Sequence, residues 1–222
     1  MHMDLLRGIF RMYGYKLDVL HYEGRQVTDV GLKYVHNDMC YPAICTIGQQ
    51  LYALQCGDYD VHKVALIQFQ TGGGCRASNY IWMLRKAVNN MDMDFVPVIS
   101  LSFSRVERSS GFSITPGMIA KGLMALIYGD MLMLLRNQVQ PYEAHPGATQ
   151  AVVDKWNAEL LRQFSRNRGL LARDRRRNLH AMAADFAAVE CRDVKRIKVG
   201  IVGEIYVKYS QFGNNGLEAF LA

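Results

Sequence analysis

The first hundred residues alternate between two patterns of hydrophobic positions. Continuous apolar runs at 64–69 (VALIQF) and 95–101 (FVPVISL) are typical of strands that are buried on both faces of a parallel sheet. Segments with helical spacing cover 4–13, 42–56 and 78–88, and glycines follow the first two, as at many helix ends. Strands that alternate with helices predict a parallel sheet joined by right-handed crossovers.

Weaker strand signals at 16–20 and 33–35 extend this pattern towards the amino terminus. Together the elements predict an α/β domain over residues 1–110. Its expected fold is a three-layer arrangement of flavodoxin-like or Rossmann-like type, in which helices cover both faces of a parallel sheet. The chain starts in a helix with no strand before it. We therefore expect it to be an internal fragment of a longer protein.

The pattern becomes purely helical after residue 110. A proline suited to the first turn of a helix opens a helical segment over 115–138, and two more helical segments follow at 149–171 and 173–190. These segments predict a helical region over residues 111–196.

The last apolar run, KVGIVGEIY at 198–206, again predicts a buried strand, followed by a turn and the start of a helix. A strand so close to the end of the chain cannot complete a sheet layer. Residues 197–222 are therefore interpreted as the truncated start of a second α/β domain. Glu204 interrupts the run, and it is either a functional carboxylate at a sheet edge or a residue at the strand end.

The composition narrows the class of protein. Half of the residues are hydrophobic and 21% are charged, which indicates a globular chain and argues against disorder. The longest apolar stretch, 118–135, is interrupted by Lys121 and Asp130, so no membrane span is predicted. The first residues do not form a signal peptide, and five cysteines in such a chain favour a reducing, cytoplasmic location.

The net charge of +6 is located in one segment. Residues 162–177 hold seven arginines and one aspartate, while the rest of the chain has equal numbers of acidic and basic side chains. Such a run usually forms a solvated helix face, and a docking surface for an anionic partner is the alternative. Stacking aromatics are missing apart from Phe164, so we expect no nucleic-acid binding.

Two cysteines occupy equivalent places in the predicted fold. Cys75 follows the strand at 64–69 and precedes a helix, and Cys40 lies two residues before Pro42, which suits the start of another helix. Both thiols are therefore expected at helix N-termini on the carboxyl edge of the sheet, where open α/β sheets bind ligands. The positive end of a helix favours the thiolate, which is the form that binds metals or acts as a nucleophile.

The loop before Cys75 contains Gly72, Gly73 and Gly74. Glycines permit positive φ angles, and their N–H groups can face an anion or a cluster sulfide. The loop matches neither the dinucleotide fingerprint nor the P-loop, and a plain tight turn is the alternative. Cys75 could also be a nucleophile with this loop as an oxyanion hole, but no positioned histidine partner is evident.

Several stretches resemble the C-terminal region of the large acyl-CoA dehydratase activase-related proteins, which are similar to the 2-hydroxyglutaryl-CoA dehydratase D-component family. The stretches that carry the resemblance are NDMCYPA (37–43), QTGGGCRASNY (70–80), VPVISL (96–101), QPYE (140–143) and KVGIVGEIYVKYSQFGNNGLEAFL (198–221).

The resemblance implies two α/β domains that hold a [4Fe–4S] cluster between them through three cysteines. Cys40 and Cys75 match the two ligands of the first domain, and the third ligand lies outside this chain. The other three cysteines are interpreted as core residues or spectators. The remaining residues of the implied cluster or substrate loop are Gly72, Gly73, Gly74, Arg76, Ser78 and Asn79.

The implied chemistry is an ATP-driven, one-electron reduction of an acyl-CoA-type substrate, as in the 2-hydroxyacyl-CoA dehydratases. The implied partners are an ATP-dependent activator, itself an iron–sulfur protein, and a second copy in the intact protein. An electron-transfer module that binds no acyl-CoA is the alternative, and the isolated fragment is not expected to be active.

Overall fold

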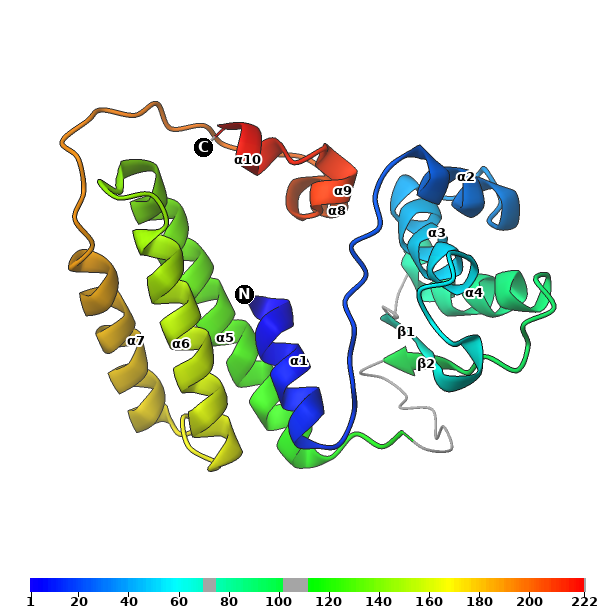
Figure 1. The fold of residues 1–222 in the computed structure, drawn as a ribbon, viewed down its shortest axis with the longest axis horizontal. Helices are drawn as coiled ribbons and strands as arrows, with labels where there is room; N and C mark the ends of the chain where they lie inside the picture. Colours follow the sequence, from blue (N-terminus) through cyan, green and yellow to red (C-terminus); the bar gives the residue numbers. More distant parts are fainter. Residues whose placement is uncertain (70–74, 102–111, 222) are drawn as a thin grey trace. The chain divides into compact units, whose positions relative to one another are not determined.

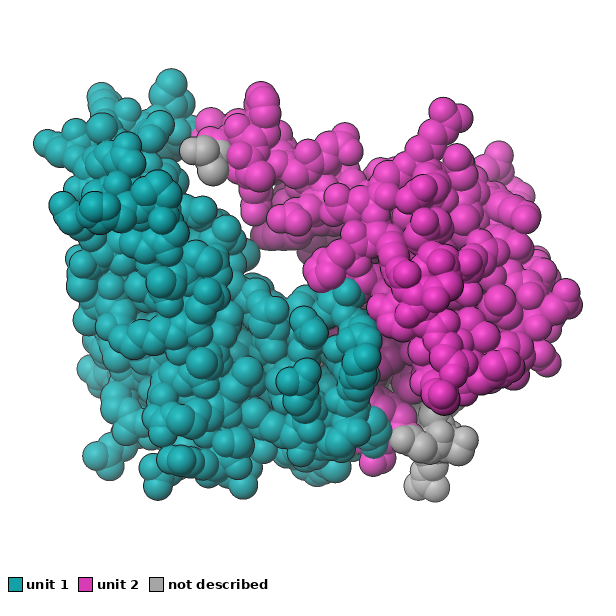
Figure 2. All heavy atoms as spheres, in the orientation of Figure 1, with its two compact units in different colours: residues 1–19, 114–198 teal, residues 20–113, 199–222 magenta. Residues whose placement is uncertain are grey.

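The computed structural model describes residues 1–69, 75–101 and 112–221. The chain forms two compact units, which are coloured separately in Figure 2. Unit 1 consists of Met1–Val19 and Ile114–Lys198, and unit 2 consists of Leu20–Ser113 and Val199–Ala222. Each unit is thus built from two separate stretches of sequence.

Unit 1 is helical (Figure 1). It contains α1 (His2–Met12), α5 (Pro116–Val139), α6 (Ala148–Ser165) and α7 (Ala172–Ala187), with the short 3-10 helix η3 (Gln140–Tyr142) after α5. The prediction of helices in this part of the sequence is confirmed. The start of α5 has the expected capping chemistry, because the Thr115 hydroxyl accepts a hydrogen bond from the Met118 N–H at 3.2 Å.

One hydrophobic core joins the four long helices of unit 1. Apolar side chains at helical spacing on each helix face the others, so burial of these stripes stabilises the bundle. The buried members are Leu5, Ile9, Ala125, Tyr128, Leu132, Val153, Trp156, Leu160, Phe164, Met182 and Phe186.

The segment Pro116–Tyr142 is the one described helix that is long and apolar enough to cross a membrane, with a mean hydropathy of 1.6 over its best window. The two charges within the stretch 118–135 have partners in unit 1. The Lys121 ammonium is buried and lies 5.0 Å from the centre of the Tyr13 ring, and the Asp130 carboxylate lies 2.9 Å from His2 Nε2. The core helix of a bundle can have the same length and composition.

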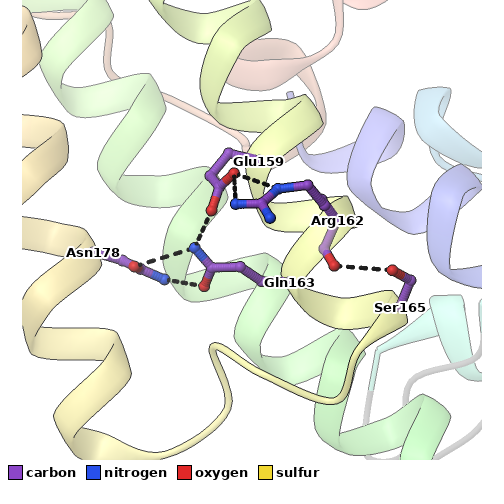
Figure 3. A network of polar contacts seen from close by, with 5 residues as sticks. All are labelled: Glu159, Arg162, Gln163, Ser165 and Asn178. Atoms are coloured by element: carbon purple, nitrogen blue, oxygen red, sulfur yellow. Dashed lines mark hydrogen bonds and ion pairs between the residues drawn. The ribbon is translucent and has the colours of Figure 1, made fainter.

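A polar network links α6 to α7 (Figure 3). The Gln163 and Asn178 side-chain amides bond to each other in both directions, at 2.7 and 3.4 Å. Gln163 also donates to the Glu159 carboxylate at 2.7 Å, and the same carboxylate accepts two hydrogen bonds from Arg162. Asn178 is buried, so these bonds supply the partners that its amide loses on leaving water.

Replacement of Tyr128 by phenylalanine should weaken unit 1. The buried Tyr128 hydroxyl donates to the Gly169 carbonyl at 2.8 Å and accepts from Asn178 Nδ2 at 3.1 Å. Without the hydroxyl these groups lose a buried partner, which costs about 1–3 kcal/mol of unfolding free energy. Urea unfolding would measure the loss. Tyr209→Phe, at an exposed position, is the control and should change the unfolding free energy by less than about 0.5 kcal/mol.

Unit 2 is an α/β structure. Its two strands, β1 (Leu66–Phe69) and β2 (Val98–Leu101), pair in parallel, with Leu66 opposite Val98 and Phe69 opposite Leu101. The parallel pairing of the two continuous apolar runs is confirmed. The helices of this part of the chain are α2 (Arg25–Tyr34), α3 (Tyr41–Gln55) and α4 (Tyr80–Asn89), with the 3-10 helices η1 (Val61–Lys63) and η2 (Arg76–Asn79).

The helices α2 and α3 approach each other closely at two glycines. A Cβ atom built on Gly31 would collide with the Ile44 carbonyl oxygen, and one built on Gly48 would collide with the Val27 carbonyl oxygen. In both cases the obstacle is backbone, which cannot rotate away. Glycine is therefore required at this crossing for packing, not for a turn.

Three predicted strands do not form. Residues 16–20 have neither helix nor strand structure. Residues 33–35 lie at the carboxyl end of α2, a helix whose buried face contains Val27 and Gly31. Residues 199–204 have neither helix nor strand structure, and α8 (Ile205–Tyr209) follows them. A strand needs a neighbour for its backbone hydrogen bonds, and the described residues offer none to these segments.

The carboxyl-terminal segment packs on unit 2. After α8 come α9 (Gln211–Asn214) and α10 (Leu217–Leu221). Phe212 and Tyr206 join a small core with the buried side chains of Val27 and Cys45. Burial raises the pKa of Tyr206 to about 12, so its phenol stays neutral in this contact at ordinary pH.

Candidate functional site

Cys40 lies at the N-cap position of α3, and Pro42 is in the first turn. The expected placement at a helix start is therefore confirmed. The Cys40 sulfur lies 2.8 Å from the hydroxyl of Tyr80, the first residue of α4. This contact joins two helix starts that are 40 residues apart in the sequence.

Cys75 lies at the N-cap position of η2, which leads directly into α4. Its sulfur accepts a hydrogen bond from the Ala77 N–H at 3.5 Å, and the residue is exposed. Both predicted ligands thus lie beside the start of α4, because Cys40 contacts Tyr80 and Cys75 leads into α4 through η2.

Tyr80 was not singled out from the sequence, and it is the central residue of this site. Burial of the ring and then the hydrogen bond to Cys40 raise the pKa of its phenol. The phenol therefore stays protonated and can donate its hydrogen bond to a Cys40 thiolate. In the sequence, its position at the end of the QTGGGCRASNY stretch is the one signal that could have marked it.

The other residues predicted for the cluster or substrate loop make different contacts. Arg76 donates from its guanidinium to the Asp38 carbonyl, which ties the Cys75 segment to the residues before Cys40. The Ser78 hydroxyl donates to the Cys75 carbonyl at 2.8 Å. Asn79 is exposed at the N-cap of α4 without a side-chain capping bond. The loop glycines at 72–74 lie outside the described residues.

Glu204 does not lie in a strand; it caps α8. Its carboxylate accepts hydrogen bonds from the Tyr206 N–H at 2.8 Å and the Val207 N–H at 3.1 Å. Two free N–H groups at a helix start explain a carboxylate here, since they need an acceptor. Its charge also contributes to the raised pKa of Tyr80, as a smaller effect than burial or the Cys40 bond.

The remaining cysteines lie elsewhere. Cys45 is fully buried, as expected for a core residue, and burial raises the pKa of its thiol. Cys56 donates to the Tyr22 hydroxyl at 3.3 Å, and that hydroxyl donates to Asp58 at 2.6 Å. Cys191 is exposed in unit 1.

Across residues 1–69, 75–101 and 112–221 no group of three or more histidine, cysteine, aspartate or glutamate side chains is arranged to hold a metal ion. The described part of the site therefore offers two thiols, Cys40 and Cys75, and a phenol that can donate to sulfur. Two thiolates fit two positions of a sulfur-rich metal centre, and further ligands would have to come from elsewhere.

No protein-family model, curated protein or solved structure matches this chain.

Proposed function

We propose that Cys40 and Cys75 supply two thiolate ligands to a [4Fe–4S] cluster, and that a cysteine outside this chain supplies the third. The observation that carries this proposal is that both thiols lie at helix starts and that two contacts join these starts, one from Cys40 to Tyr80 and one from Arg76 to the Asp38 carbonyl. The Ala77 N–H and the Tyr80 hydroxyl offer hydrogen bonds to sulfur, and such bonds tune the potential of iron–sulfur clusters.

The proposed activity is that of a 2-hydroxyacyl-CoA dehydratase-like or activase-linked protein in the cytoplasm. An ATP-dependent activator would deliver one electron, and the bound cluster would supply the redox chemistry towards an acyl-CoA-type substrate. This chain would contribute ligands and the loop with Arg76, Ser78 and Asn79. The intact protein is proposed to be a dimer. The strands β1 and β2 are proposed to belong to a larger parallel sheet, completed by other strands, in a three-layer fold.

The test is anaerobic reconstitution of the intact parent protein, which carries the third cysteine, with iron and sulfide, followed by measurement of iron content and visible absorption. Cys40→Ser and Cys75→Ser should each make the cluster labile, so that iron and absorption are lost while the circular dichroism is unchanged. Cys191→Ser is the matched control, because Cys191 is exposed like Cys75 but lies in unit 1. The proposal is wrong if Cys191→Ser abolishes the cluster and Cys75→Ser leaves it intact.

The same preparation distinguishes the dehydratase-like function from electron transfer alone. A cluster with an open coordination position should change its spectrum when an acyl-CoA is added. A spectrum that acyl-CoA leaves unchanged would favour the electron-transfer module.

A further inference from the structure

We propose that the arginine-rich start of α7 binds an acidic segment of a partner protein. The surface consists of Arg173, Arg176, Arg177 and His180, which follow one another at helical spacing and line one open depression of about 560 Å³. The proposal is independent of the cysteine site, since these residues belong to unit 1 and the cysteines to unit 2.

Positive charge at this place destabilises the helix itself. Cations near a helix N-terminus oppose the macrodipole, and like charges three and four residues apart repel each other. Arg173, in the first turn, has both disadvantages, and Arg176 and Arg177 lie three and four residues after it. Leu171 at the N-cap provides no capping side chain. The fold of α7 therefore gives no reason for Arg173 and Arg176, whereas an anionic partner does.

The described carboxylates leave most of this charge unpaired. Asp174 lies 3.3 Å from Arg177, and Glu159 is occupied by Arg162 and Gln163. No ion pair to a described carboxylate is found for Arg173 or Arg176. A guanidinium group without a carboxylate partner can bind the carboxylate of another molecule through two parallel hydrogen bonds.

A second groove, between α6 and α7, adjoins this surface at Arg177 and has a volume of about 790 Å³. It is lined by groups of both signs, among them Lys155, Glu159 and Asp185. Both depressions are open at the surface, so they admit an extended segment. The cationic row suits the carboxylates of an acidic segment, and the groove of mixed charge beside it suits polar or basic residues that flank such a segment.

Two other anionic partners fit less well. The tryptophan and phenylalanine side chains of α6 and α7, which are Trp156, Phe164 and Phe186, are all buried, so His180 is the one ring of the described surface that could stack on a base. Leu171 is exposed at the tip between the helices, but one leucine is less apolar surface than stable attachment to a lipid surface needs. The observations therefore favour a protein segment.

The test measures the binding of a fluorescent twelve-residue peptide of alternating glutamate and alanine by anisotropy at several salt concentrations. Arg173→Gln/Arg176→Gln should weaken binding roughly tenfold or more. Arg7→Gln/Arg11→Gln removes the same charge from exposed positions on α1 and should have little effect. Arg173→Lys/Arg176→Lys keeps the charge without the bidentate geometry and should give an intermediate loss.

Thermal unfolding separates binding from a structural role. Removal of two cations from the start of α7 should leave the Tm unchanged or raise it. A lower Tm would show that the arginines serve the fold, and would overturn the proposal. Equal loss in the Arg7/Arg11 control, equal binding of a glutamine version of the peptide, no binding at all, or tighter binding to a DNA duplex or to phosphatidylserine vesicles would also overturn it.

Discussion

Gly48→Ala is expected to destabilise unit 2 by about 3 kcal/mol, at the upper end of the usual cost of overpacking a core. The new methyl group would meet the Val27 carbonyl oxygen, and it would lie 3.2 Å from the backbone of Gly31. Since these atoms belong to the backbone of α2, the helices must separate, and the fully buried Val27 and Cys45 lose contact. Urea unfolding followed by circular dichroism would measure the change.

Gly122→Ala is the control for this substitution. Gly122 lies inside α5, and a Cβ there would meet no atom within 4 Å. Alanine has the higher helix propensity, so this variant should gain up to about 1 kcal/mol. Native-like stability of Gly48→Ala would contradict the close helix crossing.

Phe164→Ala should cost unit 1 about 3–5 kcal/mol, the range found when a buried phenylalanine is truncated. The Phe164 ring is fully buried near the end of α6 and lies 6.2 Å from the Tyr128 ring, centre to centre. Its removal leaves a cavity beneath the turn that leads to α7. Thermal or urea unfolding would measure the loss.

Phe220→Ala serves as the control, because Phe220 is 85% exposed and should change stability by less than about 0.5 kcal/mol. Phe164→Leu should lie between the two, since leucine fills part of the cavity. Equal effects at positions 164 and 220 would show that the bundle core is not organised around Phe164.

The helices of unit 1 and the β1–β2 pair could be predicted because their signals are local. The pair appears as two continuous apolar runs, and the start of α5 is marked by Thr115 and Pro116. The α2 helix was partly mistaken for a strand, because its buried face contains Gly31 and is weakly apolar. The run at 198–206 has the composition of a strand, but strand formation depends on a neighbour, which composition does not reveal.

For the candidate site, too, the local features could be predicted from the sequence and the long-range contacts could not. Helix-start signals were sufficient to place Cys40 and Cys75. The contact between Cys40 and Tyr80 could not be predicted, since it joins residues 40 positions apart and depends on how α3 and α4 pack. The capping role of Glu204 was also missed, because it exists only once α8 replaces the predicted strand.

The interleaved chain path affects folding during synthesis. The partners of α1 in the bundle core are α5, which leaves the ribosome about 100 residues later, and α6, which follows α5. Until then the apolar side chains of Leu5 and Ile9 have no core in which to be buried. They stay exposed on the nascent chain, where exposed apolar side chains favour aggregation. Most of unit 2 is synthesised in that interval, yet Phe212, which completes its small core, emerges after all of unit 1. Slow translation between residues 20 and 113 would therefore prolong the exposure of the apolar side chains of α1, and neither unit could complete its hydrophobic core in that time.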